Sequence, residues 1–293
     1  MADEPFPLSR AGERLYRYVV ADVFTDTPLQ GNPLAVFLDG RGLSGESMQS
    51  AARELRLSET AFVLPAEGDG HRRLRIFTPA EELPFAGHPV LGSAFVLAEL
   101  LGETALRLET SAGVVPVELE RNGRQVVFGR MEAPIPVREP YEEADELVRA
   151  LGLERSELPV EAYRSGPLHV LVALPSEDAV ATLRPDPGAL RALGEVGVSC
   201  FAGSGLRWKT RMFAPGLGVP EDPATGSAAG PLAVHLARHG RIAFGDEIEI
   251  RQGAEIGRPS VLHARADGSA EQIDRVTVAG SAVVVARGEY VVP

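Results

Sequence analysis

Three titratable side chains of this sequence could together move a proton on a small acid. Glu59 lies in the short motif Ser58-Glu59-Thr60, while His88 and Asp222 each stand directly before a proline. Histidine titrates near neutrality, and a carboxylate can remove a proton and return it, so these residue types suit general acid/base catalysis. Taken alone, an Asp-Pro pair more often caps a helix, and a glutamate at a strand start is more often an exposed carboxylate.

An internal repeat favours the chemical interpretation of His88 and Asp222. Segments 75–79 and 87–94 match segments 211–215 and 221–228, and the match aligns His88 with Asp222. Each copy predicts a strand, a loop and a helix whose N-cap is that polar residue. If the two halves face each other, both helix N-termini converge on one cleft, where their free N–H groups can hold a substrate carboxylate. Glu59 has no acidic counterpart in the second half, which suits a one-base shuttle.

The surrounding pattern predicts the elements that must position these residues. A poorly ordered tail is expected over residues 1–15 and a hairpin over residues 16–38. Helices are expected over residues 44–55, 89–101, 142–151, 187–193 and 223–238. Further strands are expected over residues 58–64, 73–77, 105–110, 114–119, 125–130, 169–174, 198–202, 247–251, 260–264, 276–278 and 283–285.

A proline-punctuated segment, residues 133–140, is the best candidate for a linker. At 293 residues the chain is about twice the usual length of a single domain. We therefore expect a first domain over residues 16–132 and a second over residues 141–293, with the possibility that the last strand joins the first domain.

Composition and charge exclude several classes of function. A net charge of -12 disfavours nucleic acid or an anionic membrane as partner, because both require a basic face. Cys200 is the only cysteine, which excludes an intramolecular disulfide and a thiolate-rich metal site and suits a reducing cytoplasm. The acidic start of the sequence and the lack of a long apolar run predict no signal peptide and no membrane span.

No metal and no cofactor are expected. His235 and His239 stand four residues apart on a predicted helix, but the glutamate of a zinc-protease motif is missing between them. We interpret this pair as surface structure near the C-terminal end of the helix, where histidine interacts favourably with the helix dipole. The sequence contains no dinucleotide-binding glycine motif, Walker loop or nucleophile elbow.

A set of motifs, in the same order from about residue 16 to the C-terminus, resembles the PhzF-like (phenazine biosynthesis-like) family. These motifs are segments 22–25, 31–37, 57–62, 77–79, 82–88, 218–227 and 257–260. The resemblance implies a diaminopimelate-epimerase-like fold, which is an α/β (α+β) architecture of two pseudo-symmetric domains. In each domain a mixed, curved sheet surrounds a central helix. The resemblance also implies a homodimer.

The same resemblance implies a cofactor-independent isomerase that acts on a small carboxylic acid. Glu59 would be its general acid/base, and His88 and Asp222 would position the substrate and assist the transfer. The donors to the substrate carboxylate would be Gly87, Gly226 and Ser227. The family is broader than one pathway, so the substrate itself is left open.

Two other interpretations of the cleft stay open at this stage. One is a one-base epimerase or racemase of an amino or hydroxy acid, and the other is a non-catalytic protein that binds small acids. The presence of Glu59, His88 and Asp222 together favours an enzyme, because binding alone would need only the helix ends. A two-thiol racemase is excluded, since Cys200 is the only thiol and Ala86 precedes the glycine of the first helix motif.

Overall fold

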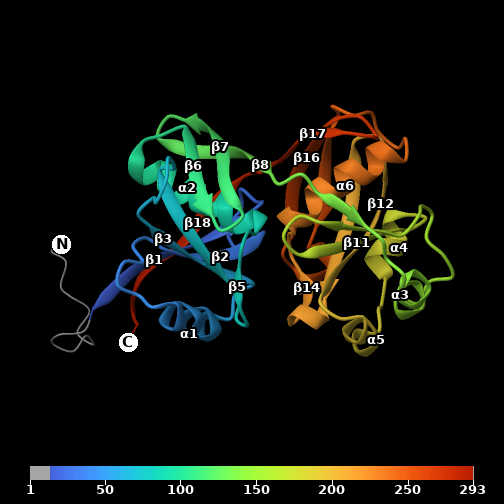
Figure 1. The fold of residues 1–293 in the computed structure, drawn as a ribbon, viewed down its shortest axis with the longest axis horizontal. Coiled ribbons are helices and arrows are strands. Elements are labelled where there is room, and N and C mark those ends of the chain that lie inside the picture. The colour runs from blue at the N-terminus through green and yellow to red at the C-terminus, as the bar shows by residue number, and fades with distance from the viewer. Residues whose placement is uncertain (1–13, 293) are drawn as a thin grey trace.

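The computed structural model describes residues 14–292, so residues 1–13 of the predicted tail lie outside the described residues. The described chain forms two lobes of mixed α/β structure side by side (Figure 1). The predicted α/β class is confirmed. Within residues 14–292, none of the helices is both long and apolar enough to span a membrane.

The first lobe is a curved sheet wrapped around one helix. Its strands pair in the spatial order β18, β1, β2, β3, β4, β6, β7, β8, and only the β2–β3 and β4–β6 pairs are parallel. The bounds are β1 Leu15–Val23, β2 Asn32–Phe37, β3 Glu59–Leu64, β4 Arg72–Phe77, β5 Glu82–Leu83, β6 Ala105–Thr110, β7 Gly113–Asn122, β8 Gln125–Ala133 and β18 Ala282–Val291. The short β5 pairs with β4. Helix α2 (Gly87–Leu101) packs against most of these strands, while α1 (Gly45–Leu55) packs on β3 and β4.

The second lobe repeats this arrangement. Its strands pair in the order β9, β10, β11, β12, β13, β15, β16, β17, and again only two pairs, β11–β12 and β13–β15, are parallel. The bounds are β9 Val137–Glu139, β10 Glu161–Arg164, β11 Leu168–Ala173, β12 Val196–Ser204, β13 Arg207–Ala214, β14 Val219–Asp222, β15 Glu247–Gln252, β16 Ser260–Gly268 and β17 Ile273–Gly280. Helix α6 (Gly226–Arg238) packs against β16 and β17, and the shorter helices are α3 Ala144–Ala150, α4 Glu177–Thr182 and α5 Pro187–Ala192.

The last strand of the chain returns to the first lobe. The last strand, β18, pairs along the whole of β1, and the segment predicted as a linker contains β9, which pairs with β10. Antiparallel pairing of β8 with β17 joins the two sheets. The assignment of residues 16–132 and 141–293 to separate domains stays a prediction.

The two central helices carry the core because their sequences are apolar around the circumference. In α2 every residue from Gly87 to Ala98 is buried, and in α6 eleven of its residues are buried, among them Leu232 and Leu236. A helix that is apolar on all sides is stable only when protein surrounds it. The predicted end of α2 is confirmed, since Gly102 adopts the left-handed conformation, with φ of 78°, that closes a helix C-terminus.

Two ion pairs define the true register of the internal repeat. Arg75 of β4 pairs with Glu82 of β5, and Arg211 of β13 pairs with Glu221 of β14. Each arginine also lies over the phenylalanine two residues further along its strand. Glu82 therefore corresponds to Glu221, whereas the sequence alignment matched Glu221 with Gly87.

This register corrects the two predicted helix caps. Counted from the paired glutamates, His88 corresponds to Ser227, and Asp222 corresponds to Leu83. His88 is the second residue of α2, and Asp222 is the last residue of β14, so neither is an N-cap. The N-cap residues are Ala86 and Thr225. The prediction for Asp222 failed because the β13–β14 pairing reaches Asp222, so the helix starts only at residue 226.

Candidate active site

A mostly buried carboxylate and a buried imidazole face each other between β3 and α2. Glu59 is the first residue of β3, and His88 lies in the first turn of α2. Glu59 Oε2 is 3.3 Å from His88 Nε2. Neither atom has a hydrogen-bond partner among residues 14–292. Because buried polar atoms are normally satisfied, these two are available to a bound molecule.

Asp222 lies beside them and accepts hydrogen bonds from three other segments. Its Oδ1 accepts from Asn32 Nδ2 at 3.0 Å and from Ser58 Oγ at 3.3 Å. Its Oδ2 accepts from Thr225 Oγ1 at 2.6 Å. Gln252 supports this arrangement, since its Nε2 donates to the Asp222 carbonyl at 2.8 Å and to Thr225 Oγ1 at 3.0 Å. The carboxylate of Asp222 is therefore held in one orientation.

Asn32 connects Asp222 to the histidine. Its Nδ2 donates to Asp222 and to the carbonyl of Ala224, and it also lies 3.4 Å from His88 Nδ1. An amide nitrogen cannot accept a hydrogen bond, so a hydrogen on His88 Nδ1 would have no acceptor there, and the ring hydrogen is placed on Nε2. That hydrogen is on the nitrogen that lies 3.3 Å from Glu59 Oε2, in a geometry that does not form a hydrogen bond with it.

Burial controls the charges of this group. Burial, and secondarily the nearby Asp222 carboxylate, raises the pKa of Glu59 well above its usual value. Burial also raises the pKa of Asp222 to about 6, although its hydrogen bonds from Thr225, Asn32 and Ser58 act in the opposite direction. The pKa of His88 falls to about 3 because the ring is buried. His88 is therefore uncharged at neutral pH, and its contact with Glu59 is not an ion pair.

The N-termini of α2 and α6 meet at the same place. Gly87 and Gly226 are the first residues of the two helices, and a Cβ on Gly87 would lie 2.8 Å from the carbonyl carbon of Gly226. No side chain caps either N-terminus: Ala86 has no acceptor, and the Thr225 hydroxyl donates to Asp222 and accepts from Gln252 rather than from a backbone N–H of α6. Two uncapped N-termini present N–H donors and positive dipole ends to a ligand anion.

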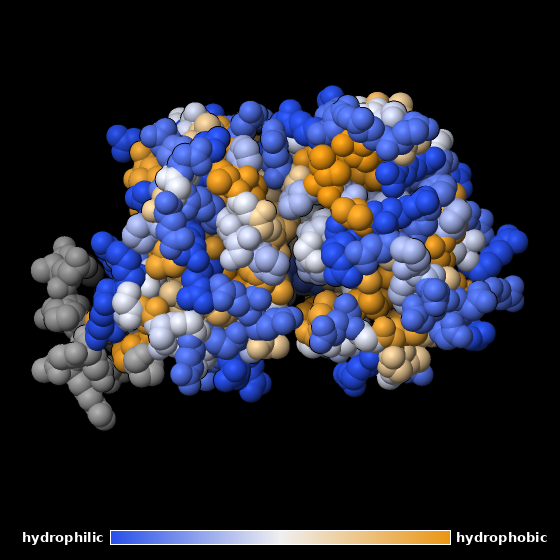
Figure 2. Space-filling view, viewed as in Figure 1, coloured by the Kyte–Doolittle hydropathy of each residue, from blue (hydrophilic) through white to orange (hydrophobic). Residues whose placement is uncertain are grey.

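A cavity of about 630 Å³ opens where these helix starts meet β3 and β14. This volume suits a small molecule. All six residues predicted to form the site line the cavity, namely Glu59, Gly87, His88, Asp222, Gly226 and Ser227. Both lobes contribute to it, and the space-filling view shows the furrow between them (Figure 2).

Sequence reasoning missed His169, which also lines the cavity. His169 Nε2 lies 2.9 Å from Ser227 Oγ, and its Nδ1 is buried without a partner within the described chain. Burial lowers the pKa of His169 to about 4. A weak echo between segments 32–36 and 166–170 was the available signal, because it places His169 on a strand matching the one that begins at Asn32.

A second feature fixes the backbone of Ser227. Pro231 lies four residues further along α6 and has no N–H to donate to the Ser227 carbonyl. Ser165 Oγ donates to that carbonyl instead, at 2.8 Å. The start of α6 is therefore tied to the loop before β11.

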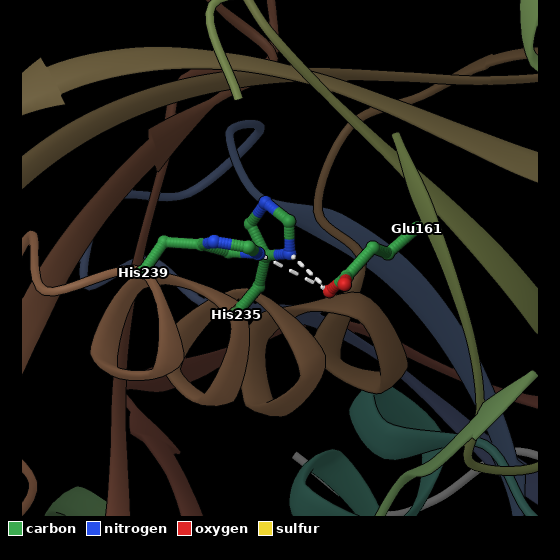
Figure 3. A group of neighbouring side chains, drawn as sticks. All are labelled: Glu161, His235 and His239. Atoms are coloured by element: carbon green, nitrogen blue, oxygen red, sulfur yellow. Dashed lines mark hydrogen bonds and ion pairs between the residues drawn. The ribbon is translucent and has the colours of Figure 1, made fainter. Parts of the chain in front are cut away.

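The histidine pair at the other end of α6 is not surface structure, contrary to the sequence-based prediction. His235 is fully buried and His239 is partly exposed, and both rings point at Glu161 of β10 (Figure 3). The prediction failed because it rested on the place of the pair near the helix C-terminus, whereas the face of α6 that carries His235 packs against Tyr163 and Phe201.

This chain is similar to known proteins over most of its length. A family profile described as "Phenazine biosynthesis-like protein" (PhzC-PhzF) matches residues 21–288. The trans-2,3-dihydro-3-hydroxyanthranilate isomerase of Pseudomonas aeruginosa is 53% identical over 94% of this chain and 99% of its own length. The enzyme of the same name from Pseudomonas chlororaphis is 51% identical over 94% of this chain and 100% of its own length.

A solved structure of the same family and one of a more distant protein are similar to this chain in fold. A phenazine biosynthesis protein of the PhzF family from Bacillus anthracis aligns with a TM-score of 0.82 at 26% identity, covering 95% of this chain and 100% of that one. A hydroxyproline epimerase from Agrobacterium vitis aligns with a TM-score of 0.64 at 13% identity, covering 94% and 92%. The second likeness shows a shared fold alone.

Proposed function

We propose a function from the premise that this chain belongs to the phenazine biosynthesis-like (PhzC-PhzF) family and is an isomerase. It moves a proton within a small cyclic carboxylic acid without a cofactor, and its substrate is trans-2,3-dihydro-3-hydroxyanthranilate. One observation carries the proposal: Glu59 Oε2 and His88 Nε2 face each other, without hydrogen-bond partners among the described residues, in a cavity at two uncapped helix N-termini.

The substrate assignment rests on the relatives and on the size of the cavity. Relatives at 53% and 51% identity, aligned over nearly their whole length, are named as isomerases of this acid. Its name describes a partly saturated ring with a carboxylate, an amino group and a hydroxyl group. A ring of that size fits a cavity of about 630 Å³.

Glu59 is the proposed acid/base group. Its ionised carboxylate takes a proton from a ring carbon, and the electron pair left on carbon delocalises towards the substrate carboxylate. Glu59 then returns the same proton to a different ring carbon, so the reaction has no net oxidation and consumes no co-reactant. A raised pKa lets this carboxyl hold the proton during the transfer.

The helix starts stabilise the charge that develops on the substrate. Backbone N–H groups of Gly87, Gly226 and Ser227 are the proposed donors to the substrate carboxylate. Fixed donors are most effective where charge grows during the reaction. Asp222 and the neutral His88 orient the ring, His88 through the hydrogen on Nε2.

The test of this function is to incubate the purified protein with trans-2,3-dihydro-3-hydroxyanthranilate in deuterated water. We expect a new isomer, identified by NMR, with the hydrogen transferred between carbons. A stereoisomer with the double bonds in their original places would indicate an epimerase. An unchanged substrate with no exchange would indicate a binding protein.

The charges of Glu59 and Asp222 predict how kcat/KM depends on pH under acidic conditions. Asp222 has a pKa of about 6, and that of Glu59 is raised by burial and by Asp222. Acidification through about pH 6 therefore protonates this pair and removes the base, so kcat/KM should rise with pH through that region. Asp222→Asn removes the neighbouring charge, so the pH at which kcat/KM rises should become lower. Burial of Glu59 should still keep that pH above 4.5, the usual pKa of this carboxyl. The measurement is kcat/KM as a function of pH for the wild type and for Asp222→Asn. The same acid-side midpoint in both proteins would contradict the prediction.

His169 is expected to act through Ser227. A buried ring N–H without an acceptor is costly, so the hydrogen of His169 is placed on Nε2, where it donates to Ser227 Oγ. The hydroxyl hydrogen of Ser227 is then free to turn towards the substrate carboxylate. His169→Ala should raise KM by about 10-fold with little change in kcat, since one hydrogen bond to a charged group is weakened.

Steady-state kinetics of four variants distinguish this role from a structural one. His169→Gln, which can place a donor near the position of Nε2, should recover part of the affinity. The effects of His169→Ala and Ser227→Ala should not add in the double variant, because both remove the same hydrogen bond. Additive effects, or a loss confined to kcat, would show that His169 acts in another way.

The homodimer, the cytoplasmic location and the absence of a cofactor stay predictions from the sequence.

A further inference from the structure

Glu161, His235 and His239 form a compact group of metal-binding atoms in the second lobe. His235 and His239 are one turn apart on α6, and Glu161 is the first residue of β10. Glu161 Oε2 is 3.1 Å from His235 Nδ1 and 3.3 Å from His239 Nε2. One ligand atom from each residue lies within 4.8 Å of the other two. Both rings and the carboxylate converge on one point (Figure 3).

The two separations between Glu161 and the histidine nitrogens match the first coordination shell of a transition metal. Nitrogen and carboxylate oxygen atoms bound at about 2.0–2.2 Å to one ion are themselves about 3–3.5 Å apart in octahedral or tetrahedral geometry. Two imidazoles with one carboxylate are a donor set that zinc and its neighbours in the first transition row prefer. Magnesium and calcium prefer oxygen alone.

Surrounding side chains hold the three groups in place. Tyr163 donates to Glu161 Oε2 at 2.6 Å, and Arg138 Nη1 donates to Oε1 at 3.0 Å. The His235 ring packs edge to face against Tyr163 and Phe201. Ligands whose orientation is fixed by such neighbours lose less conformational entropy when they bind an ion.

We propose that Glu161, His235 and His239 are a binding site for a divalent transition-metal ion, with Zn²⁺ as the best match to the donor set. The ion replaces the two hydrogens that the rings now direct at the carboxylate, and these hydrogens move to the other ring nitrogens. A three-ligand site leaves further positions for water, and the partly exposed His239 gives access to solvent.

The site is structural rather than catalytic. None of its three residues is among those that line the cavity described above. Ser227 lies eight residues before His235 on α6, which is about 12 Å along the helix axis. The ion would tie the C-terminal end of α6 to β10 and raise the stability of the second lobe without touching substrate.

Two features should make the affinity of this site for Zn²⁺ lower than that of a closed four-ligand zinc site. Arg138 bonds to Glu161, and Arg238 interacts with Tyr163, so guanidinium charges lie near the ion. The ring hydrogen displaced to His235 Nε2 would lie at a buried atom that has no partner among the described residues.

The test is a calorimetric titration of untagged, chelator-treated protein with Zn²⁺, with Mg²⁺ as the reference ion. We expect one Zn²⁺ per chain and no heat from Mg²⁺. His239→Gln and Glu161→Gln should each weaken Zn²⁺ binding at least 10-fold. His263→Gln is the matched control, because His263 on β16 is not one of the grouped ligands and packs against Phe128 of β8, and it should bind like the wild type.

Thermal unfolding gives a second readout that does not depend on activity. Zn²⁺ should raise the melting temperature of the wild type and of His263→Gln, but not that of His239→Gln, which must itself retain the wild-type circular dichroism spectrum. Isomerase activity should not change when the metal is removed. The proposal is overturned if Zn²⁺ does not bind, or if it binds equally well to His239→Gln and Glu161→Gln.

Discussion

Glu59→Gln should lower the turnover of the proposed isomerase by about 10²- to 10⁴-fold or more, because it removes the group that carries the proton. Glutamine keeps the size and polarity of the side chain beside His88, 3.3 Å away, so substrate affinity should change little. The measurement is kcat from the isomerisation assay, together with Kd from calorimetry of the substrate or product.

A matched control separates the loss of the base from a general loss of charge in the cavity. Glu195 is an exposed acid at the edge of the same cavity, and Glu195→Gln should stay within about threefold of the wild-type kcat. A binding protein would show the reverse pattern, with no turnover in the wild type and a Glu59→Gln effect confined to affinity. If Glu59→Gln retained wild-type proton transfer, the one-base proposal would be wrong and His88 would become the candidate.

Gly87→Ala should damage both stability and activity, because a methyl group there has no space. Its Cβ would lie 2.8 Å from the carbonyl carbon of Gly226 and 3.0 Å from the backbone nitrogen of Ser227, so two helix starts would have to separate. Overpacking of this kind costs about 1–3 kcal/mol of unfolding free energy. Displacement of the carboxylate donors by even about 1 Å should lower kcat/KM by about 10²-fold. Urea unfolding and steady-state kinetics measure the two effects.

Gly45→Ala is the corresponding control on another helix. Gly45 is also the first residue of its helix, but an added Cβ would meet only the flexible end of the Arg75 side chain, at 3.0 Å. Its unfolding free energy should stay within about 0.5 kcal/mol of the wild type, and its activity should be unchanged. Equal losses in Gly45→Ala and Gly87→Ala would mean that the contact between the two helix starts is not what constrains position 87.

The sequence by itself determined the local secondary structure of this protein and the side chains that are available for its chemistry. The hairpin, the apolar helix that ends at Gly102 and the cap at Ser44 all follow from interactions between residues close in the chain, and each is confirmed. The motifs that contain Glu59, His88 and Asp222 indicated which side chains lie in the cavity, because a family resemblance preserves residue order even where local geometry is ambiguous.

Tertiary structure decided the features that depend on distant segments. Asp222 belongs to a strand rather than a helix because pairing with β13 extends to it, and no local signal records where that pairing stops. Asn32 lies next to Asp222, 190 positions away, only because the two lobes meet there. Burial, which sets the pKa of Glu59 and His88 and encloses His235, is likewise a property of the assembled sheets. A sequence specifies which groups can titrate or bind, whereas the folded surroundings fix their charge and their partners, since desolvation depends on all the neighbours at once.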